Sequence, residues 1–245
     1  MGQVNQHKRA LLITGTIVPN SNFVVHTNVQ ERRDEYYASL IFYADNFEED
    51  DVFFLENSSY DFSADAEFQQ LLTDKKITLL KFSVSDKYNL GKGYQEFEML
   101  DAAIDKLYDK YTSFIKITGR YKVLNLKELT DYTCYGLVAD FHKKLKVTQT
   151  NVFYVSRIFY NNYLKNLYLK VDDSNGVYIE KIVYEKVHTQ ELKKEIKLFP
   201  KNPIITGISG SYGGTLNRNK LKMKIRNIER KLLCVFRINQ FLIEY

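Results

Sequence analysis

The chain has 245 residues, a formal net charge of +5 and a hydrophobic fraction of 44%. This length suits one α/β domain with a full core. With 27% charged residues, 3 Pro and 11 Gly, the composition excludes a disordered, collagenous or linker-rich protein. Cys134 and Cys234 lie far apart and outside any Cys/His cluster, so neither a disulfide framework nor a zinc site has support. We therefore expect a cytoplasmic protein.

Strands and helices are predicted to alternate along the first half of the chain. Continuous apolar runs indicate buried strands at 9–18, 51–55, 77–82 and 113–118, and apolar positions at helical spacing indicate helices at 29–46 and 94–111. No run is long and apolar enough to cross a membrane. This order favours a mostly parallel central sheet covered by helices.

The second half has weaker periodicity. Strands are predicted at 135–139 and 151–155, and helices at 157–169 and 177–188. We place a catalytic domain at 1–206, a Gly- and Ser-rich mobile loop at 207–216 and a basic amphipathic C-terminal helix at 217–245.

Polar groups follow several of the predicted strands. In open α/β sheets ligands bind outside the carboxyl ends of the strands, so these groups are candidates for a site. They lie at Thr14 and Gly15, at 56–61, at 92–96, at 116–120 and at 140–142. Five such ends on one edge favour a site there more than any single one does.

Four segments resemble one family. They are Glu56-Asn57-Ser58-Ser59-Tyr60-Asp61, Gly91-Lys92-Gly93-Tyr94-Gln95-Glu96, residues 114–121 and Ile208-Ser209-Gly210-Ser211. Over roughly residues 9–215 the chain is similar to bacterial lipopolysaccharide and capsule glycosyltransferases that use nucleotide-diphosphate sugars. The resemblance implies a GT-A-like fold, a nucleotide-sugar co-substrate with no tightly bound cofactor, and a lipid-linked glycan acceptor at the inner face of the cytoplasmic membrane.

The sequence departs from that family where a carboxylate pair would hold a metal ion after the fourth strand. It has Lys116-Ile117-Thr118-Gly119-Arg120 there, and strand alternation places Lys116 and Thr118 on one face. Cations can stabilise a leaving diphosphate electrostatically, so we expect Lys116 and Arg120 to act without a metal. The alternative is a solvated strand end with an ordinary turn.

Lys92, Gly93 and Glu96 open the next candidate segment. Backbone N–H groups at a helix start favour anions, so Gly91-Lys92-Gly93 could hold a phosphate, although it is neither of the usual phosphate-loop patterns. Glu96 could hold a sugar hydroxyl or an active-site lysine, or simply cap the helix. With Thr14, Gly15, Glu56, Asn57 and Thr118, these residues are the predicted donor-binding group.

Acceptor activation requires a carboxylate that takes the hydroxyl proton. Glu180 is our choice, because it opens a predicted helix where the resemblance implies an acidic residue on the acceptor side; the alternative is an exposed carboxylate paired with neighbouring Lys181 or Lys186. Asp140 would be the ligand if the reaction needed a metal, yet Asp140-Phe141-His142 lacks a third ligand. Ser156 and Arg157 are acceptor candidates, and Ser209 belongs to a possible lid.

Residues 217–237 combine eight Lys and Arg with regularly spaced apolar residues. Such a segment suits an anionic membrane surface; no nucleic-acid-binding signature accompanies it. The alternative to membrane binding is a helix that packs its apolar face on the domain and leaves its basic residues in solvent. Two other functions stay open: a non-catalytic basic module that binds anionic lipid or nucleic acid, and, ranked last, a nucleotidyltransferase, because the acidic pairs at 48–51 and 172–173 look like surface turns.

Overall fold

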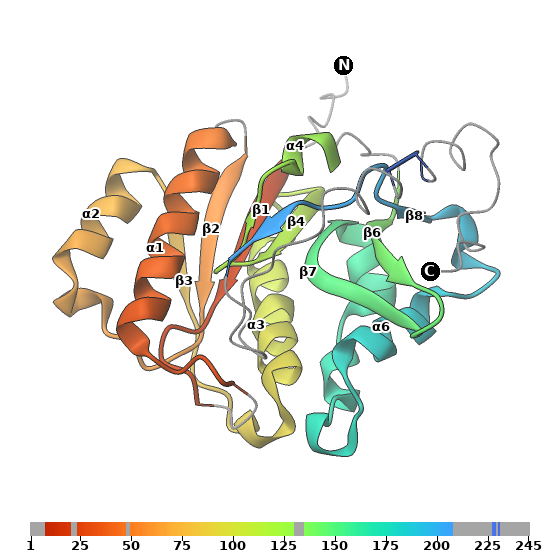
Figure 1. The fold of residues 1–245 in the computed structure, drawn as a ribbon, viewed down its shortest axis with the longest axis horizontal. Helices are drawn as coiled ribbons and strands as arrows, with labels where there is room; N and C mark the ends of the chain where they lie inside the picture. The colour runs from red at the N-terminus through yellow and green to blue at the C-terminus, as the bar shows by residue number, and fades with distance from the viewer. Residues whose placement is uncertain are drawn as a thin grey trace.

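The computed structural model describes residues 8–20, 24–47, 50–129, 135–207, 227, 228 and 230. Within them the chain forms seven strands of one sheet, two strands of a small ribbon, and helices that cover the large sheet (Figure 1). The elements are, in chain order, β1 (Arg9–Gly15), α1 (Val29–Asn46), β2 (Asp51–Glu56), η1 (Phe62–Ala64), α2 (Ala66–Asp74), β3 (Thr78–Lys81), η2 (Tyr88–Leu90), α3 (Lys92–Leu107), β4 (Ser113–Thr118), β5 (Lys122–Val123), α4 (Leu126–Leu129), β6 (Leu137–His142), β7 (Val147–Ser156), α5 (Arg157–Phe159), η3 (Tyr160–Leu164), η4 (Leu167–Lys170), η5 (Asp173–Asn175), α6 (Ile179–Val187), η6 (Leu192–Lys194), β8 (Ile196–Leu198) and β9 (Ile205–Thr206).

The large sheet has the order β3-β2-β1-β4-β7-β6-β8. Strands β3, β2, β1 and β4 are parallel, β7 is antiparallel to both of its neighbours, and β6 pairs in parallel with β8. The expected α/β architecture with a mostly parallel, helix-covered sheet is confirmed. The apolar runs of the central strands are buried on both faces, as parallel sheets require.

Two hydrophobic cores lie on the two faces of the sheet. Helix α3 packs Phe97, Leu100 and Ile104 into one core together with Ile182 and Val183 of α6. Helices α1 and α2 form the other core, in which Tyr36 and Phe68 surround Phe54. Strand alternation divides β1 and β4 between the two cores. A polar side chain at the end of either strand therefore faces α3 and α6 or faces α1, but not both.

The predicted helix at 157–169 is wrong. The chain there makes one α turn, a π turn over Tyr160–Leu164 and a 3₁₀ turn over Leu167–Lys170. Asn166 breaks the helical path with a left-handed backbone (φ 65°), and the buried Asp101 accepts its N–H at 2.6 Å. Sequence spacing cannot reveal this long-range contact, which stabilises the break.

None of the helices in the described part of the chain combines the length and apolarity that crossing a bilayer requires. The predicted C-terminal helix falls almost entirely outside the described residues. Asn227 and Arg230, which are described, are anchored on the domain. Asn227 accepts from the backbone and side chain of Asn202, and Arg230 donates to Phe199 and Lys201 carbonyl oxygens.

Candidate functional site

The strand order of the sheet reverses between β1 and β4, although the two strands are hydrogen-bonded to each other. We call this topological switch point the β1–β4 break. From β1 the chain moves outward to β2 and β3, then returns across the sheet through α3 to β4 on the other side of β1. Helices α1 and α3, which flank this point, therefore cover opposite faces. Ligands of open α/β sheets bind at such a point, outside the carboxyl ends of the strands. Thr14 and Thr118, paired in register, lie at that end of the two strands.

Lys116 is the central charge on the α3 side of this break. It is fully buried, and its Nζ lies 2.7 Å from Glu96 Oε1, 2.9 Å from Thr118 Oγ1 and 2.8 Å from the Thr150 carbonyl oxygen. An ammonium group has three hydrogens, and here each has an acceptor. Burial lowers the pKa of Lys116, while Glu96 and Glu180 act in the opposite direction. Lys116 is thus a positioned charge inside the protein and not a solvated strand end.

Glu96 is bound through one of its two oxygens. Its Oε1 accepts from Thr14 Oγ1 at 2.6 Å and from Thr118 Oγ1 at 3.1 Å, in addition to Lys116. Burial would raise the pKa of Glu96, but the Lys116 ammonium and the two hydroxyls outweigh it and hold that pKa below its usual value. The structure thus brings together four predicted residues, and Glu96 holds a buried lysine as one alternative anticipated.

Glu180 lies close to this group. It is half-buried in the first turn of α6, where its Oε1 accepts from Thr150 Oγ1 at 3.2 Å, and its charge acts on Lys116. Thr150 therefore links Lys116 to Glu180, because its carbonyl oxygen accepts from Lys116 and its hydroxyl donates to Glu180. A close approach of α3 and α6 fixes this arrangement: a Cβ on Gly93 would lie 2.8 Å from Ile179 Cγ2.

Asp173 occupies the helix start that the sequence suggested for a phosphate. Helix α3 begins after Gly91, which has φ 117°, and the backbone N–H of Lys92 donates to the Asp173 carboxylate. A Cβ on Gly91 would lie 2.1 Å from Asp173 Oδ2, so only glycine admits this contact. The anion at this helix start is thus the protein's own carboxylate. Burial and the Glu180 charge raise the pKa of Asp173 to about 6, although Lys92 opposes them.

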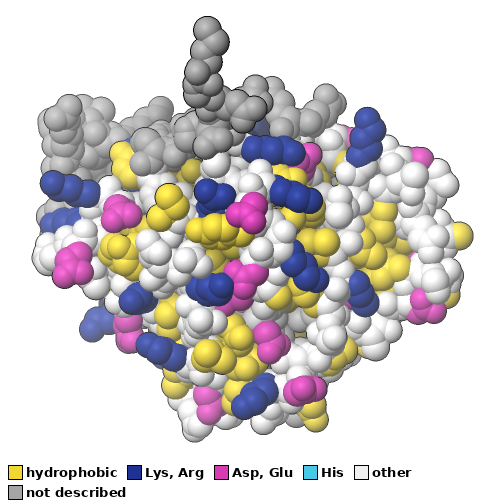
Figure 2. All heavy atoms as spheres, turned by 180° about the vertical axis from the view of Figure 1, so that it is seen from behind, with side chains coloured by type: hydrophobic (Ala, Val, Ile, Leu, Met, Phe, Trp, Pro, Cys, Tyr) yellow, Lys and Arg dark blue, Asp and Glu magenta, His cyan; other side chains and the backbone are white. Residues whose placement is uncertain are grey.

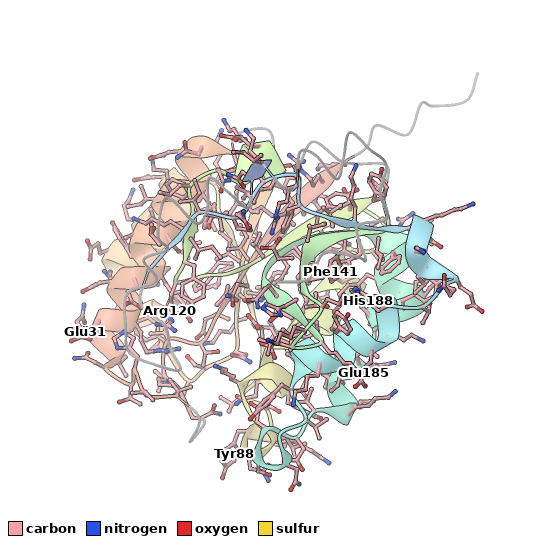
Figure 3. All side chains as sticks on the ribbon, turned by 45° about the vertical axis from the view of Figure 1, so that its right-hand side comes forward. Glu31, Tyr88, Arg120, Phe141, Glu185 and His188 are labelled. Carbon is pink, nitrogen blue, oxygen red and sulfur yellow. The ribbon has the colours of Figure 1, made fainter. Side chains whose placement is uncertain are left out.

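Arg120 lies on the other side of the break. It is 7% exposed, and its Nη1 donates to Glu35 Oε2 of α1 at 2.9 Å. Glu35 also lies 3.4 Å from His26. Figure 3 shows Arg120 and Glu31 on the α1 side, and Glu185 and His188 on the α6 side. Lys116 and Arg120, which we expected to stabilise the leaving diphosphate, pair with helices on opposite faces of the sheet.

Glu56 and Asn57 organise the loop after β2. Glu56 is fully buried and accepts from the backbone N–H groups of Ile17 and Ser58 and from Lys81. Asn57 accepts from Thr16 Oγ1 at 2.6 Å and donates to the Gln95 carbonyl oxygen at 3.2 Å. Glu56 joins the loops after β1 and β2, and Asn57 holds them against α3. Gly15 is needed for packing, since a Cβ there would lie 2.4 Å from the Phe54 ring.

Ser156 and Arg157 lie at the opposite edge of the sheet. Because β7 is antiparallel to β4, its carboxyl end pairs Ser156 with Ser113, the first residue of β4. Ser156 caps the turn that follows by accepting from Phe159 N at 3.2 Å, and Arg157 donates to the Tyr108 carbonyl oxygen at 2.5 Å. The structure therefore separates these two acceptor candidates from Glu96 and Glu180.

Asp140 pairs with a different partner from the Lys116–Glu96 cluster, by which we mean Thr14, Glu96, Lys116, Thr118, Thr150, Asp173 and Glu180. Asp140 lies 2.8 Å from Arg230, a residue of the predicted basic tail, and both side chains are buried. This charge of the tail is therefore inside the protein instead of facing solvent. Among the described residues, no group of three His, Cys, Asp or Glu side chains is arranged to hold a metal ion. Ser209 lies outside the described residues.

Sequence reasoning missed two members of the cluster. Asp173 belongs to an acidic pair that we expected at a surface turn; Asp172 does make such a turn with Ser174 and Asn175, whereas Asp173 is 9% exposed. Thr150 contributes a carbonyl as well as a hydroxyl. Gly91, immediately before a helix and without a capping side chain of its own, was the one available sign that another segment supplies the cap.

Comparisons with known proteins identify the fold but no family. No family model matches the chain, and no curated protein matches it. Among solved structures, it is similar to a protein from Desulfovibrio desulfuricans G20 assigned as a nucleotide-diphospho-sugar transferase, at 11% identity and a TM-score of 0.51, over 79% of this chain and 80% of that chain.

Two further structures are more distant. Mouse xyloside xylosyltransferase 1 has 10% identity and a TM-score of 0.44, over 78% of this chain and 85% of that chain. The inositol-1-phosphate CTP transferase of T. maritima has 13% identity and a TM-score of 0.46, over 92% and 97%. The likeness to the D. desulfuricans protein shows a shared GT-A-like α/β fold. No comparison identifies the lipopolysaccharide or capsule family that the loop segments resemble.

Proposed function

We propose that this chain is a glycosyltransferase that moves a sugar from a nucleotide-diphosphate-sugar donor to a hydroxyl acceptor. The observation that carries the proposal is the buried Lys116–Glu96 pair at the break between β1 and β4, with Glu180 beside it. An ion pair set among hydroxyls at this edge is costly to bury and is placed where α/β sheets bind ligands. The fold shared with a protein assigned as a nucleotide-diphospho-sugar transferase supports the donor class.

Glu180 is the proposed base. In a direct displacement the acceptor oxygen forms a bond to the anomeric carbon while the bond from that carbon to the diphosphate oxygen breaks. The bonding pair leaves with the diphosphate, and the acceptor proton passes to Glu180. Glu180 is partly exposed, and within the described part of the chain it accepts one hydrogen bond, from Thr150, so the carboxylate is able to accept that proton.

We propose that the reaction needs no metal ion. The support is the residue type at the end of β4, where Thr118, Gly119 and Arg120 stand in place of the carboxylate pair that the family resemblance implies. All three hydrogens of the Lys116 ammonium group already have acceptors in the protein. Lys116 therefore acts on a bound substrate through its electric field and through Glu96, which it holds in place.

The proposed acceptor is a surface polysaccharide carried on lipid, with residues 217–237 on an anionic membrane surface. The resemblance of the loop segments and the basic composition of that segment support this acceptor and placement. Arg230 is excluded from the membrane-facing charges, since it pairs with Asp140. Basic and acidic side chains are interspersed on the face shown in Figure 2, which argues against a nucleic-acid partner for that face.

Calorimetric titration with UDP-, GDP-, CMP- and dTDP-sugars, with Mn²⁺ and then with EDTA, tests the donor and the metal. We expect one nucleotide sugar to bind equally in both buffers. Binding of a nucleoside triphosphate instead would favour nucleotidyl transfer, and binding of no nucleotide would favour a non-catalytic module.

Glu180→Gln tests the base. We expect donor turnover to fall by about 10²- to 10⁴-fold with donor affinity nearly unchanged, because a base acts in the transition state. Glu185→Gln, on the exposed surface of the same helix, is the matched control and should turn over normally. Equal rates for the two variants would remove Glu180 from the mechanism.

A further inference from the structure

Glu96 presents one bound and one unbound oxygen. Three donors from β1 and β4 converge on Oε1, whereas Oε2 has no hydrogen-bond or ion-pair partner within the described segments. The Glu96 side chain keeps 23% of its surface exposed, although the Lys116 side chain beneath it keeps only 1%. Oε2 is also not among the buried polar atoms that lack a partner. The free oxygen is therefore accessible from outside the sheet.

Side chains of β1 and β4 fix the orientation of the Glu96 carboxylate. Thr14 and Thr118 are held in register by the β1–β4 ladder, and Lys116 is held by Thr118 and by the Thr150 carbonyl. Rotating the carboxylate would break bonds to three groups at once. Pre-set acceptors of this kind bind a ligand without first losing conformational freedom.

The surrounding charges indicate what Oε2 can bind. Lys116 of β4 is the charge that acts on Glu96, Glu180 of α6 acts on Lys116 and on Asp173, and Lys92 at the start of α3 acts on Asp173. Three carboxyl groups and two ammonium groups are linked by these interactions. A phosphate brought to Oε2 would meet a carboxylate directly, whereas a hydroxyl would donate to it.

We propose that Glu96 Oε2 recognises a hydroxyl group of the donor, either on the transferred sugar or on the ribose, and that Lys116 is the positioning residue that keeps Glu96 ionised and oriented. This inference rests on the proposed function and assigns the hydroxyl-reading atom of its site. The diphosphate then lies away from Glu96.

The test compares Glu96→Gln/Lys116→Met with wild type and with Glu98→Gln, a control on the same helix. The double variant removes both buried charges together, which proteins tolerate far better than the loss of one. The ligands are the nucleotide sugar that binds wild type, its nucleoside diphosphate and its 2′-deoxyribose analogue. Titration calorimetry with EDTA gives each affinity, and circular dichroism checks the fold.

We expect the double variant to lose roughly 10- to 100-fold in affinity for the nucleotide sugar, the range for a hydrogen bond to a charged group. For whichever ligand lacks the recognised hydroxyl, wild type and double variant should bind alike. Glu98→Gln should bind all three ligands like wild type. Equal affinity of the double variant and wild type for the nucleotide sugar would overturn the inference while leaving the proposed function intact.

A loss that appears only with Mn²⁺ would make Glu96 a metal ligand and would also overturn the inference. Wild type that binds no nucleotide sugar would overturn the proposed function and this inference with it.

The single variant Lys116→Met adds a pH measurement, whose result would not change if Lys116 had only a structural role. Without its partner the pKa of Glu96 rises, so affinity should fall as the pH is lowered from about 8 to 6 in this variant and stay level in wild type. A level profile in both would remove Lys116 from the proposal.

Discussion

Each side of the β1–β4 break has a buried basic side chain paired with a carboxylate, but the hydrogen bonding of the two carboxylates differs. On the α1 side, Arg120 pairs with Glu35, and Arg32 donates to the Ile17 and His26 carbonyl oxygens. On the α3 side, Lys116 is bound on all its hydrogens, yet Glu96 above it keeps one oxygen open. The α1 cluster fastens the loop after β1 to its helix, whereas the α3 cluster presents an acceptor at the sheet edge.

Charge type and strand-end position do not by themselves mark a binding residue. Arg120 and Lys116 looked equivalent in the sequence, since Lys116 lies near the end of a predicted buried strand and Arg120 lies just after it. The two partner carboxylates differ: both oxygens of Glu35 lie near a basic side chain, whereas the polar contacts of Glu96 within the described residues all involve Oε1. An atom that remains accessible and unpartnered is the better sign of a ligand contact than the charge beneath it.

The largest effect should come from breaking the α3-side pair. Lys116→Met takes the cation away from Glu96 and also leaves Thr118 Oγ1 and the Thr150 carbonyl oxygen without their donor, so we expect the free energy of unfolding to fall by about 3–5 kcal/mol. Urea denaturation followed by circular dichroism measures it. The double variant with Glu96→Gln should recover most of the loss. If the double variant were as unstable as Lys116→Met, packing around the lysine stem would be the cause instead of its charge.

A smaller effect is expected on the α1 side. Arg120→Met removes the bond to Glu35, which keeps 17% of its side chain exposed and can recover some hydration, so stability should fall by roughly 1.5–3 kcal/mol. Nucleotide-sugar affinity should stay within about twofold of wild type, because Arg120 serves the α1 loop. A large loss of affinity in a variant of nearly normal stability would restore Arg120 to the donor site and contradict the comparison.

The smallest effect concerns pH. The pKa of Asp173 is raised to about 6 in the folded state, so the folded protein binds more protons than the unfolded chain between about pH 4 and 6, and stability falls as the pH rises through that window. Asp173→Asn removes this loss and still accepts from Lys92 N–H. We expect it to gain about 1–2 kcal/mol at pH 7, reduced for solvent screening.

Thermal unfolding at pH 5 and 7 measures the effect. Asp101→Asn is the matched variant, because burial likewise raises the pKa of Asp101 to about 6. Asp101 belongs to α3 and accepts from the Tyr160 hydroxyl, so it is not part of the Lys116–Glu96 cluster. Both variants should flatten the pH slope. An unchanged slope in Asp173→Asn would mean that folding does not raise the pKa of this carboxyl.

Local periodicity predicted most elements correctly. The helix at 29–46 and the strand at 113–118 coincide with α1 and β4, and the apolar positions of α3 are buried as expected. These elements follow from apolar spacing and from caps close in sequence, such as Asn28, which accepts from Glu31 N. The failure at 157–169 lies where a distant carboxylate, Asp101, binds the backbone of Asn166.

The sequence by itself determined that this is an α/β protein with polar groups at one edge of its sheet, because burial imposes periodicities that can be read locally. It also determined that Lys116 and Thr118 share a face. Only the tertiary structure decided that Glu96 and Glu180 join them, that Asp173 takes the helix start, and that antiparallel β7 carries Ser156 to the far edge. Strand order, strand direction and unpartnered atoms arise from contacts between residues tens of positions apart, and local spacing contains no record of them.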